Sequence, residues 1–74
     1  MNKERRKKVT DAIVAIGKIE ELIQNILDEE QEAFDNMPEG LQTSENGIIS
    51  EEAQENLDSA IDALEEAISY LEEI

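Results

Sequence analysis

The last third of the chain carries apolar residues at the period of an α-helix. Leucines recur every seven positions at Leu57, Leu64 and Leu71, and further apolar residues fall three or four positions from each. Acidic residues occupy the opposite side of the same turns. This pattern predicts an amphipathic helix over residues 51–73. Because one helix cannot bury its own apolar stripe, the upstream residues have to supply a partner.

A second apolar stripe runs through the first half of the chain and predicts a helix over residues 3–36, with Asn2 as its N-cap. Two rows define the stripe, and they are Val9, Ile16 and Ile23 in one row and Ala12, Ile19, Ile26 and Ala33 in the other. Four more residues widen it, namely Ile13, Leu22, Leu27 and Phe34. A stripe of this width favours contact with two or more helices over a two-stranded coiled coil.

The connection between the two stripes is predicted to be a loop over residues 37–50. Pro38 ends the first helix, because proline disfavours helical geometry in the residue before it, and Gly40 is expected to supply a positive φ. Asn46-Gly47 is a second turn signal. Ser50 is the expected N-cap of the second helix.

Gly17 lies inside the first predicted helix, where glycine costs about 1 kcal/mol relative to alanine. A glycine kept in a helix at this cost is typical of a site where another element approaches closely. We therefore expect a neighbouring helix to contact the backbone at Gly17.

These elements predict an all-α fold in which residues 1–74 form one domain, a long antiparallel two-helix hairpin. Dimerisation into a four-helix bundle would bury both wide stripes. Exchange of an extended helix pair between two chains is the rival topology. The expected core of the oligomer consists of Ile16, Ile19, Ile23, Ile26, Leu57, Ile61, Leu64, Ile68 and Leu71.

Charge is strongly unbalanced along the chain. Twenty acidic residues against six basic ones give a net charge of −14, which on composition alone would indicate disorder. The two regular apolar stripes favour a folded chain instead. All six basic residues lie within the first 18 positions, whereas residues 19–74 hold eighteen acids and no base.

The basic start, residues 3–8, has two interpretations. A nucleic-acid-binding arm is one of them. The net charge would repel phosphates, and the chain offers only one Tyr and one Phe for stacking on bases. We therefore expect no direct binding of nucleic acid, and we expect the basic start to pair with an acidic helix end.

The residue types exclude most catalytic and metal chemistry. There is no Cys and no His, so disulfides and thiolate or imidazole metal sites are impossible, and the serines lack an ordinary activating base. An EF-hand alignment beginning at Asp35 fails, because Met37 and Pro38 stand in ligand-loop positions where they do not fit. We expect a protein that is not an enzyme and needs no cofactor or metal.

Two carboxylate pairs keep one enzymatic alternative open. Glu29-x-x-Glu32 and Glu52-x-x-Glu55 resemble fragments of Mg²⁺-dependent helical nucleotide pyrophosphatases. Such pairs arise on any acidic helix, so a solvated surface is the preferred interpretation.

The acidic surface has three interpretations: solubilising charge, docking onto a basic partner protein, and mimicry of nucleic acid. The absence of any base from residue 19 onward favours the last two over ordinary mixed-charge solvation. The candidate partner-binding residues are Glu29, Glu30, Glu32, Asp35, Glu51, Glu52, Glu55, Asp58 and Asp62. A purely structural module, such as a scaffold or assembly adaptor, is the alternative, and it would bind through apolar contacts.

The chain resembles short acidic proteins encoded by bacteriophages, prophages and related mobile elements of Gram-positive bacteria. The similar features are the start NKERRKK at residues 2–8, the segment DEEQEAFDNMPEGLQ at residues 28–42, and the closing Leu/Ile/Ala-Glu repeat. This resemblance implies a phage accessory factor that inhibits a host enzyme, as DNA mimics and anti-defence factors do. It carries over no residue role.

The resemblance also implies a bacterial host for this chain. No apolar run approaches the ~20 residues that span a bilayer, and no signal-peptide core follows the basic start. We therefore expect no membrane association and a location in the bacterial cytoplasm.

Overall fold

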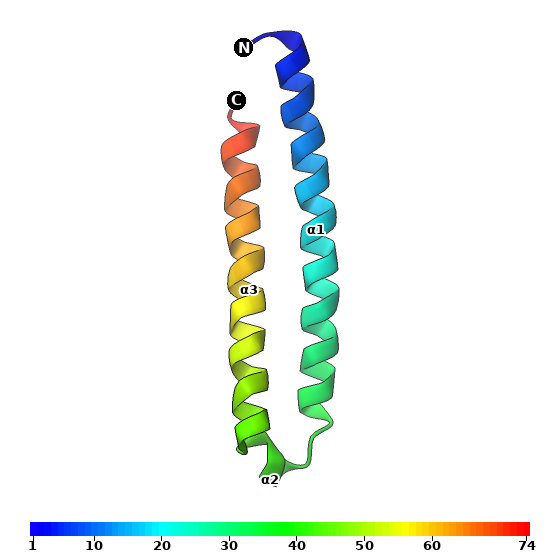
Figure 1. Cartoon of the computed structure of the whole chain (residues 1–74), viewed down its shortest axis with the longest axis vertical. Helices are drawn as coiled ribbons and strands as arrows, with labels where there is room; N and C mark the ends of the chain where they lie inside the picture. Colours follow the sequence, from blue (N-terminus) through cyan, green and yellow to red (C-terminus); the bar gives the residue numbers. More distant parts are fainter.

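The computed structural model describes all of residues 1–74 and contains only helices: α1 (Lys3–Asp35), α2 (Glu39–Gln42) and α3 (Glu45–Glu72). α1 and α3 run antiparallel and side by side, with both termini at one end and α2 at the other (Figure 1). The Cα atoms extend over 58 × 15 × 12 Å, so the molecule is a thin rod. The predicted all-α fold with a long helix pair is confirmed.

The first helix begins and ends close to its predicted bounds. Asn2 is its N-cap as predicted, since the Asn2 side-chain oxygen accepts a hydrogen bond of 2.8 Å from the backbone N–H of Arg5. The helix stops at Asp35, before Pro38, which adopts φ −55° and ψ 142°. The proline therefore acts as the predicted stop signal.

The connection between the long helices is shorter than predicted. α3 begins at Glu45, whereas the sequence predicted a loop over residues 37–50 and a helix start at residue 51. Its N-cap is Ser44, which accepts a hydrogen bond of 3.5 Å from the N–H of Gly47. Asn46-Gly47 is therefore part of the first helical turn. With 28 residues, α3 is nearly as long as the 33-residue α1 and reaches the start of α1.

The side chain and backbone of Gln42 hold the connection in place. The Gln42 amide donates to the carbonyl oxygens of Phe34, at 3.1 Å, and Met37, at 3.3 Å, near the end of α1. The Gln42 carbonyl packs against Gly47 so closely that a Cβ there would overlap it. Gly40 lies in α2, and no residue has a positive φ, so the positive φ predicted at Gly40 is wrong.

The seam between α1 and α3 uses two of the apolar rows of α1. One row is Val9, Ile16 and Ile23, and the other is Ile13, Glu20, Leu27 and Phe34. The row of Ala12, Ile19 and Ile26 lies outside this seam, where Ile19 is 49% exposed and Ile26 is 44% exposed. Two helices bury only a narrow strip between them, and α1 has three apolar rows, so one row remains outside.

The core of the hairpin is sparse. Leu27 and Ile61 are the only buried hydrophobic residues, and no side chain is completely buried. The α3 leucines at positions 57, 64 and 71 and Ile68 are half-buried along the seam. The pairing of α1 with α3 therefore removes only part of each apolar stripe from water.

Ser50 lies inside α3 rather than at its N-cap, and it is buried between the helices. Its hydroxyl donates a hydrogen bond of 2.8 Å to a carboxylate oxygen of Glu30 on α1. The Gln54 amide donates to the same hydroxyl at 3.3 Å. This polar contact joins the two helices near the loop end of the rod.

Gly17 does not mark a close approach within the chain, contrary to the prediction. A Cβ built at Gly17 would meet no atom within 4 Å outside its own turn, whereas one at Gly47 would meet the backbone of Gln42. A side chain can therefore be accommodated at position 17 but not at position 47.

The substitution of alanine at these two positions should change stability in opposite directions. Gly17→Ala should raise the free energy of unfolding by about 1 kcal/mol, because alanine is the better helix former. Gly47→Ala should lower it by about 1–3 kcal/mol, because the added methyl group displaces the connection. Urea unfolding followed by circular dichroism measures both. Equal shifts of the same sign would contradict the positions of these residues.

Candidate functional site

The predicted acidic residues lie mainly on the surface. Eight of the nine candidate partner-binding residues are exposed, and only Glu30 is half-buried, accepting the hydrogen bond from Ser50. Glu30 therefore joins the helices and is a poor contact for another molecule. The remaining eight are available to a partner.

Four of these acids form a continuous stripe on α3. Glu51, Glu55, Asp58 and Asp62 are spaced by four, three and four residues, which keeps them on one side of a helix. We call these four residues the acidic stripe. The fifth candidate on α3, Glu52, lies about 100° around the helix from Glu51.

The candidate acids of α1 do not lie on a single side of their helix. Glu32 and Asp35 continue a line that starts at Asp28. Glu29 instead follows Leu22 by seven residues and lies on another side of α1. The nine candidates therefore do not form one face, and the acidic stripe of α3 is the most regular part of the set.

Almost none of the charge is compensated within the chain. The single ion pair joins Lys7 to Asp11 over 3.5 Å at the surface of α1. No base lies within ion-pair distance of any acid from residue 19 onward. The carboxylates of the acidic stripe therefore have no intramolecular cation to displace before they meet a partner.

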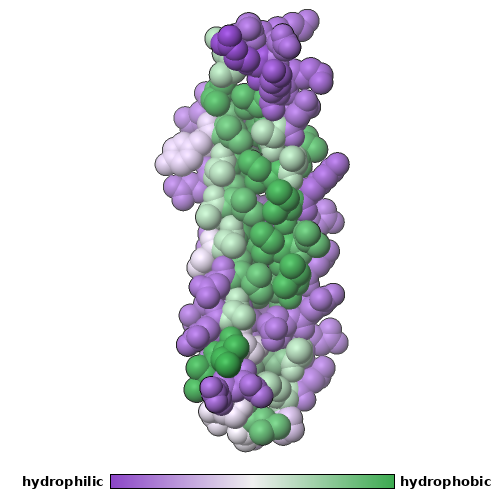
Figure 2. Space-filling model, viewed as in Figure 1, coloured by the Kyte–Doolittle hydropathy of each residue, from purple (hydrophilic) through white to green (hydrophobic).

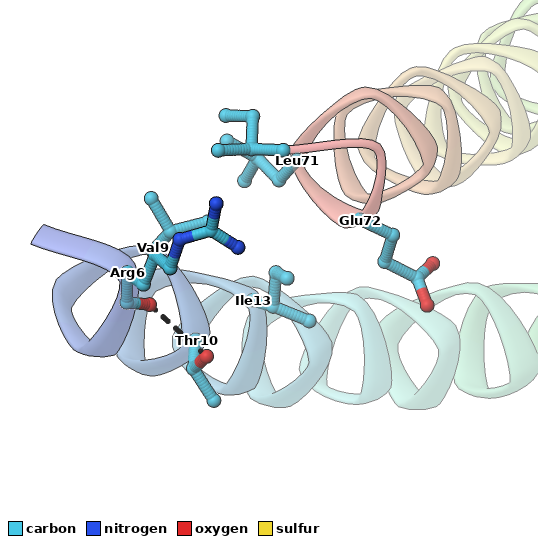
Figure 3. A pocket seen from close by; sticks show the side chains of 7 residues that line it. Arg6, Val9, Thr10, Ile13, Leu71 and Glu72 are labelled. Atoms are coloured by element: carbon cyan, nitrogen blue, oxygen red, sulfur yellow. Dashed lines mark hydrogen bonds between the residues drawn. The ribbon is translucent and has the colours of Figure 1, made fainter. Parts of the chain in front are cut away.

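The basic start meets the end of α3 without forming the predicted ion pairs. Arg6 and Glu72 both line a groove of about 410 Å³ between the helix ends. Figure 3 shows Arg6 and Glu72 on opposite sides of Ile13, with Arg6 extended toward Leu71. The Arg6 Nε donates to the Met1 carbonyl at 3.3 Å. Apart from Lys7, the basic residues of the start therefore have no ion-pair partner in the hairpin and can contact another molecule.

Glu20 is an acid in the seam that the sequence analysis did not single out. It occupies the row of Ile13 and Leu27, and one of its carboxylate oxygens is shielded from solvent without a hydrogen-bond partner. The seven-residue spacing from Ile13 through Glu20 to Leu27 is the sequence signal that could have located it. A groove of about 250 Å³ opens beside it, lined by Gly17, Glu20, Glu21, Gln24, Asn25, Ile61 and Glu65.

The carboxylates do not gather into a metal centre. No group of three or more Asp or Glu side chains is positioned to hold a metal ion. The pairs Glu29/Glu32 and Glu52/Glu55 stand on different helices, α1 and α3.

None of the three helices combines the length and the apolarity that crossing a membrane requires.

A second candidate surface is apolar and covers one side of the rod. The row of α1 that the seam leaves out lies on the same side as the alanines that flank the leucines of α3. Figure 2 shows the result as an apolar band over the upper and middle part of the rod, which polar residues interrupt toward the loop end. We call this surface the apolar face, and its residues are Ala12, Ala15, Ile19, Leu22 and Ile26 of α1 with Ala53, Ala60 and Ala67 of α3.

Comparisons with protein families, with curated proteins and with solved structures find no match to this chain. The function is therefore inferred from the chain's own surfaces. The resemblance to phage and mobile-element proteins stays a hypothesis.

Replacement of Glu20 by leucine should stabilise the hairpin. Glu20→Leu removes a shielded carboxylate oxygen that has no partner and adds an apolar side chain to the seam, which should raise the free energy of unfolding by roughly 1–2 kcal/mol. Glu21→Leu, on the exposed neighbour, removes the same charge and controls for the change in net charge. A gain from Glu21→Leu that equals the gain from Glu20→Leu would show that burial in the seam is not the cause.

Proposed function

We propose that this chain is a non-enzymatic protein-binding module that docks onto a basic surface of another protein through its acidic stripe. The proposal rests on one observation: the four carboxylates of the acidic stripe are exposed, and no acid from residue 19 onward has a cationic partner in the chain. Complementary charge speeds association and selects partners. The module would act as a homodimer, a four-helix bundle in which the apolar faces meet.

The density of charge along the rod favours a partner that handles nucleic acid. Twenty carboxylates over a length of 58 Å amount to one per about 3 Å. One strand of B-DNA carries one charge per ~3.4 Å of its axis. Summed over all of its sides, the rod therefore carries negative charge at a density comparable to that of one DNA strand. Direct binding of nucleic acid is not expected, because the same charges repel phosphates.

The resemblance to phage and mobile-element proteins suggests a biological role for such mimicry. The partner would be a host enzyme of nucleic-acid metabolism or of defence, and the module would inhibit it in the bacterial cytoplasm. This step is analogy, and it depends on the docking proposal rather than supporting it.

The apolar face supports a second candidate, a structural scaffold or assembly adaptor. Leu22 on that face is 60% exposed, which is typical of a surface that another protein covers. Such a module would bind through apolar contacts and tolerate changes in the acidic stripe. A Mg²⁺-dependent nucleotide pyrophosphatase is the weakest candidate, since it rests on the Glu29/Glu32 and Glu52/Glu55 pairs alone.

The acidic stripe can be tested by charge reversal. A variant with Glu51, Glu55, Asp58 and Asp62 changed to lysine should no longer capture the partner from a bacterial lysate. It should keep its helicity, because the helix propensity of lysine is similar to that of Glu and better than that of Asp. Elution of immobilised protein with a salt gradient, followed by mass spectrometry, identifies the partner. We expect the wild-type protein to release a DNA- or RNA-handling protein at moderate salt.

The matched control reverses four other exposed acids, which are Glu39, Glu66, Glu72 and Glu73, and so gives the same net charge. Partner binding should survive in this control. Binding that survives in the stripe variant would disprove the proposed interface. A partner that stays bound at high salt would favour the scaffold. Turnover of a nucleoside triphosphate with Mg²⁺ would favour the nucleotide pyrophosphatase.

A further inference from the structure

One exposed side of α1 changes character along its length. At steps of three and four residues it reads Arg5, Lys8, Ala12, Ala15, Ile19, Leu22, Ile26 and Glu29, and all eight are exposed. The stripe is basic near the start of the helix, apolar in the middle and acidic toward the loop. If a second copy of this stripe runs in the opposite direction, its acidic end lies against the basic end of the first copy and the two apolar middles meet.

A second copy of the chain is the occupant that best fits the apolar face. The hairpin buries only Leu27 and Ile61 as hydrophobic residues, which is little for a chain of 74 residues without disulfides. Ile19 lies at the middle of α1. A two-fold axis that passes close to Ile19 would therefore bring the apolar middle of the stripe against the same residues of the second copy.

We propose that the second copy runs in the opposite direction, so that the loop end of each hairpin lies beside the basic start of the other. This inference rests on the dimer proposed above. Around an axis close to Ile19, Lys8 of one copy comes beside Glu29 of the other. The small Ala12 and Ala15 lie opposite the larger side chains at positions 22 and 26, so the two surfaces interdigitate.

Charge decides between this arrangement and a parallel one. A parallel pair also covers the apolar face, but it brings the two loop ends together. Residues 28–58 hold eleven acids and no base, so a parallel pair would stack two such regions. The antiparallel pair separates them by the length of the rod and places each next to residues 3–8, which hold five of the six bases. Of those five, only Lys7 has an ion-pair partner in its own chain.

Glutamate substitutions on and off the apolar face test which surface is covered. Leu22→Glu should raise the dissociation constant of the dimer by roughly tenfold or more, because it places a charge in the interface. Val14→Glu is the matched control, since Val14 is 54% exposed but lies about 140° around α1 from Ile19. Sedimentation velocity over a range of concentrations measures both. Equal weakening by the two substitutions, or none by Leu22→Glu, would overturn the assignment of the face.

Distances between spin labels test the direction. The chain has no cysteine, so Glu39→Cys places a single label at the loop end and Glu21→Cys places one near the middle of α1. Double electron–electron resonance should give a distance close to the 58 Å rod length for Glu39→Cys and a distance under ~30 Å for Glu21→Cys.

Each alternative gives a different pair of distances. Short distances from both labels would show a parallel pair and overturn the proposed direction while leaving the dimer intact. The absence of a dipolar signal from both labels would remove the dimer itself, and the direction with it. Neither result would affect the separate test of the acidic stripe, so the two proposals fail independently.

Discussion

The pairing of α1 and α3 along a narrow seam is the constraint on which the rest of this molecule depends. Two helices can bury one strip of each other, yet both carry stripes wider than that strip. The seam closes over Leu27 and Ile61 and leaves Ile19, Leu22 and Ile26 outside. Helices in folded proteins gain most of their stability from tertiary packing, so a pair with so little buried surface is marginal by itself. This uncovered side is the basis of the proposal that a second copy completes the fold.

The distribution of charge makes the two ends of the rod different, although α1 and α3 run antiparallel. The basic start and the acidic remainder give the rod ends of different electrostatic character, and no ion pair links the two long helices. The charges also oppose the helix dipoles, because basic residues crowd the start of α1 and no long helix has a base in its last turn. Contacts with another chain, whether a second copy or a basic partner, would offset this cost. The acidic stripe of α3 and the apolar face lie on different sides of the hairpin, so both can act in one molecule.

Local signals in the sequence were sufficient for the helices but not for their contacts. The period of the leucines and isoleucines located both long helices, and Asn2 and Pro38 marked the ends of α1. The start of α3 was misplaced because Ser44 and Ser50 are equally plausible caps in sequence. The contact between the Gln42 carbonyl and Gly47, which favours Ser44, depends on the folded connection.

For the candidate site too, local features could be predicted from the sequence but contacts between the helices could not. Exposure of the acids followed from their spacing, since stretches of acids with no bases belong on a solvated surface. The sequence left open which rows of α1 face α3, because the rows of Ile19 and Leu27 both flank the row of Ile16 and only the position of α3 selects between them. Glu20 was overlooked because its spacing places it in the row of Ile13 and Leu27, but only the position of α3 shows that this row is buried.

The dependence of unfolding on protein concentration tests the central claim most directly, which is that the hairpin is completed by a second copy. Thermal unfolding would be followed by circular dichroism at fixed salt over a hundredfold range of concentration. For a dimer, each tenfold rise in concentration adds about 1.4 kcal/mol of apparent stability, so the melting temperature should rise steadily. A melting temperature that stays constant over the whole range, with cooperative unfolding, would show that the single hairpin is sufficient and would contradict this account.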